Sequence, residues 1–115
     1  MSGATDLDQT LAALADPTRR QVIALLSDKP RRSSELAASL SISRPAMSRH
    51  LRVLRQAGLV AEETQADDAR TRVYELRRPG FAELRGWLDE VEAFWADQLL
   101  AFKAHAERKR RKERR

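Results

Sequence analysis

The side chains best suited to chemistry are arginines and serines on one predicted helix, which Ser43 caps and Gly58 ends. At about 100° of rotation per residue, Met47, Leu51 and Leu54 fall on one face of this helix. The opposite face carries Pro45, Ser48, Arg49, Arg52 and Gln56. Because a guanidinium group donates paired hydrogen bonds to phosphate or guanine, this spacing predicts a helix that buries its leucines and presents cations to a polyanion.

The net charge of +5 is concentrated in two places. Residues 31–58 contain six arginines and one acidic residue, Glu35. Residues 107–115 contain seven basic and two acidic residues, which leaves residues 1–106 neutral as a whole. Acidic residues outnumber basic ones over 59–106, which favours one directed electropositive patch over a uniformly basic surface. The charges indicate a polyanionic partner, and a helix face that is merely solvated is the alternative interpretation.

The residue inventory argues against other kinds of site. The chain has no cysteine, which excludes disulfides and thiolate metal sites. Ser48 and His50 do not face each other on a helix, and no glycine-rich phosphate loop is present, so we expect no enzyme and no cofactor. We also expect no metal site, because His50 and His105 are the only histidines. The position of His50 beside the apolar stripe favours a partly buried, satisfied histidine over a contact with nucleic acid.

Three further helices are expected before the arginine-rich one. Leu7, Leu11 and Leu14 form an apolar stripe, and Asp16 followed by Pro17 ends this helix and begins the next. A third, short helix has the sequence SSELAASL, with its first serine as a candidate cap. Residues 41–43 alone separate it from the arginine-rich helix, and so short a connection predicts a helix-turn-helix.

After the arginine-rich helix the pattern becomes extended. LVAEETQ and RTRVYELR are typical of two strands joined by a turn at Asp67 and Asp68. The break at 78–80 then opens a long helix whose apolar side chains lie within about 60° of one another: Leu84, Leu88, Val91, Trp95, Leu99 and Phe102. This helix is longer than so small a core can cover. Its surplus apolar face therefore predicts a partner, most simply a second copy of the chain.

Helices 1–4, a two-stranded hairpin and a long C-terminal helix define a mainly α winged helix-turn-helix with a small β-hairpin. The segments ALADPTRRQVIALL, SELAASLSISRPAMSRHLRVLRQAGLV and RTRVYEL resemble the ArsR family of bacterial transcriptional repressors, from about Leu11 to Leu76. The resemblance implies that SRPAMSRHLRVL lies on the recognition helix, that the hairpin is the wing, and that the first and last helices form a homodimer. Relatives that sense metals do so through cysteines or acidic and histidine clusters, which this chain lacks, so no inducer is indicated.

The resemblance and the outward face together give candidate site residues. For DNA binding they are Arg44, Pro45, Ser48, Arg49, Arg52, Arg70 and Arg72. We assign Arg44, Ser48 and Arg49 to bases or nearby phosphates, and Arg52 to phosphate because it lies further from the helix start. The two wing arginines could reach the minor groove or the backbone. The candidate dimer interface consists of Leu7, Leu11, Leu88, Val91, Trp95, Leu99 and Phe102.

These features predict a sequence-specific regulator of transcription, a repressor that binds double-stranded DNA as a homodimer. The winged helix-turn-helix domain is expected over residues 5–106, with dimerisation helices at 6–15 and 80–106, and a basic, disordered tail over 107–115. No stretch has the roughly 20 apolar residues that cross a bilayer, and no signal peptide is present, so we expect a soluble, cytoplasmic protein without a membrane partner. The alternative is a protein-interaction module that uses the long helix and attracts nucleic acid only non-specifically.

Overall fold

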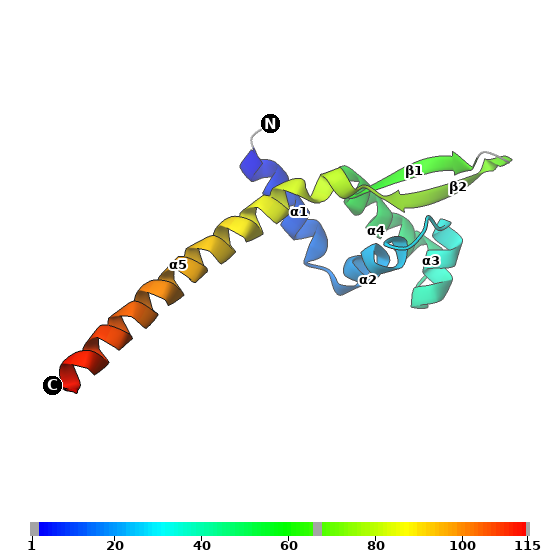
Figure 1. Ribbon diagram of the computed structural model, residues 1–115. Coiled ribbons are helices and arrows are strands. Elements are labelled where there is room, and N and C mark those ends of the chain that lie inside the picture. Colours follow the sequence, from blue (N-terminus) through cyan, green and yellow to red (C-terminus); the bar gives the residue numbers. More distant parts are fainter. Residues whose placement is uncertain (1–2, 66–67, 115) are drawn as a thin grey trace. The chain divides into compact units, whose positions relative to one another are not determined.

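The computed structural model describes residues 3–65 and 68–114, with side chains described for 6–65 and 71–114. The chain divides into two compact units, Met1–Leu84 and Arg85–Arg115. The first unit contains α1 (Gly3–Leu14), α2 (Pro17–Leu26), α3 (Ser33–Leu40), α4 (Arg44–Gln56), β1 (Val60–Gln65), β2 (Asp68–Leu76) and the 3-10 helix η1 (Arg78–Phe81). The element α5 (Ala82–Glu113) begins in the first unit and makes up the second. The predicted winged helix-turn-helix is therefore confirmed (Figure 1).

Local capping sets most of the helix boundaries. The Asp16 carboxylate accepts a hydrogen bond from the backbone N–H of Thr18 at 3.0 Å, and Pro17 opens α2 as predicted. The Ser43 hydroxyl accepts from the backbone N–H of Ala46 at 3.2 Å at the start of α4. Gly58 ends this helix with a φ of 77°, in the left-handed region that glycine adopts without steric cost.

The start of α3 differs from the expectation that its first serine is the cap. Arg32 occupies the cap position, and its backbone N–H donates to Glu35 Oε1 at 3.2 Å. The Arg32 guanidinium donates to the same oxygen at 3.0 Å, so Glu35 closes the helix start from the third helical position. The hydrogen bond from Arg32 lowers the pKa of the Glu35 carboxyl.

The four helices α1, α2, α3 and α4 and the start of β1 all contribute side chains to the hydrophobic core. Its buried members are Ala13, Val22, Leu26, Leu36, Ala37, Met47, Leu51, Leu54, Leu59 and Val60. The inward face predicted for α4 is confirmed, because Met47, Leu51 and Leu54 are all fully buried. Burying this face turns the polar face of α4 outward.

Strands β1 and β2 form an antiparallel ribbon, seen as two green arrows in Figure 1. Val60 pairs with Leu76 and Glu62 pairs with Tyr74 in its register. Tyr74 also forms an isolated bridge with Arg31, in which the two residues exchange backbone hydrogen bonds of 2.8 and 3.0 Å. The predicted turn residue Asp67 lies outside the described residues, and Asp68 begins β2.

The helix α5 is a single helix of 32 residues that includes most of the basic tail. The expectation of disorder from residue 107 therefore differs from the structure, in which the helix continues to Glu113. Alanine, glutamate, lysine and arginine are strong helix formers, and basic side chains near a helix C-terminus favour its dipole. The sequence after Gly86 also contains no glycine or proline that would end the helix.

Candidate nucleic-acid interface

The outer face of α4 carries five of the predicted DNA-binding residues. Arg44, Pro45, Ser48, Arg49 and Arg52 are all exposed, on the side of the helix opposite its buried apolar stripe. The cap formed by Ser43 fixes where this helix starts, and the buried stripe fixes its rotation. The structure therefore gives these side chains a defined direction away from the core.

A concave, basic surface lies where α3, α4 and the wing meet. It encloses about 380 Å³ and is lined by Arg32, Ser33, Ser34, Arg44, Ser48, Thr71 and Arg72. Three of the predicted residues, Arg44, Ser48 and Arg72, are brought together here from two different elements. Arg49 and Arg52 are not part of its lining and lie further along α4.

Sequence reasoning missed the contribution of α3 to this surface. Arg32, Ser33 and Ser34 line it from the start of that helix, where backbone N–H groups lack helical partners. The arginine pair at 31–32 belongs to the basic cluster, but its direction depends on how α3 packs. Guanidinium groups, serine hydroxyls and N–H groups are all donors, so the surface can bind the oxygen atoms of phosphate.

The wing arginines have different surroundings. Arg72 is exposed on β2, and its guanidinium donates to Glu62 Oε1 at 2.8 Å. Arg70 lies on the same strand, but its side chain falls outside the described residues. The hydrogen bond and charge of Glu62 raise the pKa of Arg72, which keeps this cation protonated.

His50 is half-buried and faces α2. Its Nδ1 atom lies 3.4 Å from Arg19 Nη1 and 4.0 Å from Asp16 Oδ2. Arg19 also donates to the carbonyl oxygens of Ala13 at 2.6 Å and Ala12 at 3.2 Å, at the end of α1. The prediction of a satisfied histidine that links α4 to its neighbours is confirmed. His50 therefore belongs to the packing between helices.

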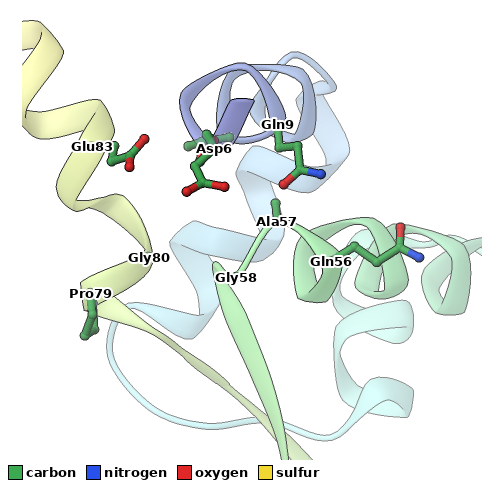
Figure 2. A pocket seen from close by; sticks show the side chains of 9 residues that line it. Asp6, Gln9, Gln56, Ala57, Gly58, Pro79, Gly80 and Glu83 are labelled. Atoms are coloured by element: carbon green, nitrogen blue, oxygen red, sulfur yellow. The ribbon is translucent and has the colours of Figure 1, made fainter. Parts of the chain in front are cut away.

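A second cavity, of about 350 Å³, lies between α1, the end of α4 and the start of α5 (Figure 2). Gly58 and Gly80 form part of its wall, and its polar side chains are Asp6, Gln9, Thr10, Gln56 and Glu83. A Cβ atom at Gly80 would collide with the carbonyl group of Gly58, so only glycine fits this approach. Among the described residues, no three histidine or acidic side chains are grouped to hold a metal ion.

The predicted dimer residues are largely solvent-exposed in the single chain. In α1, Leu7 is half-buried and Leu11 is exposed. In α5, Trp95 is 59%, Leu99 66% and Phe102 72% exposed. Leu88 is also exposed, and Val91 is half-buried.

In the part of the chain that the structure describes, no helix has the length and apolarity needed to cross a membrane.

The chain is similar in sequence to known bacterial regulatory proteins. The family model of bacterial regulatory proteins of the arsR family matches residues 16–62, from the cap of α2 into β1. The HTH-type transcriptional regulator Rv2034 of Mycobacterium tuberculosis is 41% identical over 95 residues, covering 83% of this chain and 83% of the relative. The transcriptional repressor SdpR of Bacillus subtilis is 32% identical over 56 residues, covering 49% of this chain and 62% of the relative.

A solved structure extends the similarity beyond the family model. The ArsR-like transcriptional regulator from Rhodococcus sp. RHA1 is 29% identical and has a TM-score of 0.72. The match covers 87% of this chain and 92% of the solved chain. The matched part is therefore longer than the segment that the family model covers.

Proposed function

Because the chain belongs to the arsR family of bacterial regulatory proteins, which are DNA-binding transcriptional regulators, we propose that it acts as a homodimeric repressor that binds one operator sequence through α4. The observation that supports this most directly is the convergence of Arg44, Ser48 and Arg72 on one concave surface. A major groove about 12 Å wide admits an α-helix, and a wing beside that helix can then contact the flanking backbone. The similarity to SdpR, a transcriptional repressor, favours repression over activation.

The exposed side chains of α4 divide between the bases and the backbone. Arg44, Ser48 and Arg49 lie in the first two turns of α4, the end of a recognition helix that meets base edges. Arginine reads guanine through two parallel hydrogen bonds, and serine contacts either a base or a phosphate. Pro45 lies exposed in the same turn, where its missing N–H leaves no donor unsatisfied. Arg52 lies a turn later, where a phosphate is the nearer partner.

The wing and the start of α3 supply backbone contacts in this proposal. Arg72 and Arg32 line the same surface as Arg44 from two other parts of the fold, β2 and the residue before α3. Arg70 adds a further cation on the wing. Contacts of this kind position a protein on the duplex and add little discrimination between sequences.

The homodimer is proposed from the apolar side chains that the single chain leaves uncovered. Large exposed apolar patches are rare on monomers and mark interaction sites. The exposed residues of α5 share one face with Val91 and Leu88, which gives a stripe that can pack against its symmetric copy. A two-fold dimer then predicts an operator with inverted half-sites centred about 10 base pairs apart, one turn of the duplex.

Selection of duplexes from a random-sequence pool tests this function. We expect an inverted repeat to be enriched, and binding of that duplex to exceed random DNA by at least about a thousandfold. Sedimentation should give twice the 13.1 kDa mass of one chain. Absence of any enriched sequence, together with a stable complex between α5 and another protein, would favour the interaction module instead.

A further inference from the structure

One carboxylate joins the recognition helix to the wing. Glu62 lies on β1, and its Oε1 atom accepts from Arg72 Nη1 of β2 at 2.8 Å. Its Oε2 atom lies 3.0 Å from Nη1 of Arg55, in the last turn of α4. Each carboxylate oxygen therefore holds one arginine, and the two arginines come from different elements.

The surroundings of Glu62 fix its position more firmly than those of an ordinary surface acid. Its side chain is 16% exposed, whereas that of Arg72 is 67% exposed. The hydrogen bond from Arg72 lowers the pKa of the Glu62 carboxyl, partial burial opposes this shift, and the charge of Arg55 adds to it. Glu62 is therefore ionised at neutral pH. Tyr74, its partner in the strand register, also lowers the pKa of this carboxyl.

The geometry connects Glu62 to the concave basic surface without placing it in the lining. Arg72 lines that surface with Arg44 and Ser48, and its guanidinium donates to Glu62, which is not part of the lining. A guanidinium has five N–H donors, so Arg72 keeps donors for a phosphate while one is bound to Glu62. The carboxylate thus determines the direction from which this cation approaches DNA.

We propose that Glu62 is a positioning residue for sequence discrimination, which holds Arg72 and Arg55 in fixed places and restrains their attraction to phosphate at unrelated sequences. This inference rests on the proposed function and adds to it a residue that would not itself touch DNA. The ion pairs fix the wing relative to α4, so Arg72 meets the backbone only where α4 fits the groove. On random DNA, where α4 does not fit, the carboxylate opposes binding through Arg72 alone.

Replacing Glu62 has two opposing effects on DNA affinity, because this residue both carries a negative charge and positions two arginines. Glu62→Gln removes a negative charge next to two cations, which strengthens binding to every duplex. Each carboxylate oxygen of Glu62 holds one arginine, and in glutamine one of these oxygens becomes an NH2 donor. The arginine that faces this NH2 group loses its acceptor and its fixed direction. On the operator this loss offsets the gain in charge, whereas on random DNA nothing offsets it. Exposed ion pairs change an equilibrium about twofold to fivefold each, so the ratio of the two affinities should fall about threefold to tenfold.

The experiment measures fluorescence anisotropy of full-length protein on the selected duplex and on random duplex, at several salt concentrations. Glu63→Gln is the matched control, because it removes the same charge from the next residue of β1. Glu63 is exposed and forms no ion pair among residues whose side chains are described. Glu62→Asp is a second variant that keeps the charge but shortens the side chain so that it cannot reach both arginines. Thermal unfolding checks that each variant is folded.

Three outcomes are informative. The inference predicts that Glu62→Gln and Glu62→Asp both lower the affinity ratio, that Glu63→Gln leaves it unchanged, and that Glu62→Gln has little further effect in an Arg55→Gln, Arg72→Gln background. Equal effects of Glu62→Gln and Glu63→Gln would overturn it and leave only general charge. If Glu62→Gln does not fold, the ratio of operator to random affinity is measured on the folded Glu62→Asp variant, and an unchanged ratio overturns the inference. If the proposed function itself is wrong, the wild-type protein will bind both duplexes equally, which separates that failure from failure of this inference.

Discussion

Arg19 Nη1 lies 3.4 Å from Nδ1 of His50, so one guanidinium links the first turn of α2 to the middle of α4. The same arginine satisfies carbonyl groups at the end of α1. Three helices therefore meet at this pair, on the side of α4 that faces α2. His50 is half-buried at this junction, whereas its neighbour Arg49 is exposed on the outer face of α4.

We expect His50→Ala to lower the free energy of unfolding by about 0.5–1.5 kcal/mol, the net value of one hydrogen bond. Its ratio of operator to random affinity should remain that of the wild type. Urea denaturation and anisotropy measure the two quantities. A variant with unchanged stability and a lost preference for the operator would instead make His50 a DNA-reading residue.

Arg49 and Arg52 should differ in what their loss removes. Arg49→Ala should cost about 1–3 kcal/mol on the operator and little on random DNA, because a base contact is lost. Arg52→Ala should weaken binding to both duplexes and reduce the slope of log K against log salt by about 0.9. Each variant is the control for the other, since both arginines are exposed on α4. Equal losses on both duplexes for Arg49→Ala would contradict the assignment to a base.

The exposed stripe of α5 predicts that Trp95→Asp separates the dimer without unfolding the single chain. A carboxylate without a partner in an apolar interface costs several kcal/mol, on the order of 2–7 for a polar group, whereas an exposed one costs little. Sedimentation and far-UV circular dichroism distinguish separation from unfolding. Ala93→Asp adds the same charge on the other side of α5 and should leave a dimer. A dimeric Trp95→Asp protein would place the interface elsewhere.

Two glycines give opposite predictions for the same substitution. A Cβ at Gly58 or at Gly86 would meet no atom within 4 Å, so neither change is limited by space. Gly58 has a φ of 77°, and alanine there should destabilise the protein by about 1–2 kcal/mol. Gly86 lies inside α5, and alanine there should stabilise it by up to about 1 kcal/mol. The two shifts in Tm test this pair, and shifts of the same sign would contradict it.

The basic end of α5 should add affinity without adding discrimination. Glutamine at Arg108, Lys109, Arg110 and Arg111 preserves helix propensity while removing four charges. We expect operator and random DNA to be bound more weakly by the same factor, with a salt slope flatter by about 0.9 for each lost phosphate contact. An unchanged slope would show that these residues do not reach the duplex.

Features encoded within a few residues were predictable from the sequence. The caps at Asp16 and Ser43 and the left-handed Gly58 are local, and each was found where it was expected. The rotation of α4 was also predictable, because three apolar residues at helical spacing allow one buried face. The helix α5 continues past the predicted end at residue 106, because the charged residue types that suggested a solvated tail also favour a helix.

Features that depend on tertiary packing were not predictable in this way. Arg32 reaches the basic surface only because α3 packs beside α4 and β2. Glu62 meets Arg55 and Arg72 only after the strand register and the end of α4 are both fixed. Neither relationship leaves a periodic signal in the sequence. Glu62, for example, is 7 positions from Arg55 and 10 from Arg72, and the three residues lie on different elements.

The bridge between Arg31 and Tyr74 also limits how this protein can aggregate. A two-stranded ribbon exposes unpaired N–H and C=O groups along its edges, which can recruit a strand from another molecule. The backbone N–H and C=O of Tyr74 are both hydrogen-bonded to Arg31, so the outer edge of β2 is already paired near the C-terminal end of the strand. A foreign strand could pair only nearer the tip, where the first half of β2 carries Arg70 and Arg72. Basic side chains on an edge disfavour such pairing, so the hairpin is protected from sheet extension by backbone pairing at one end and by charge at the other.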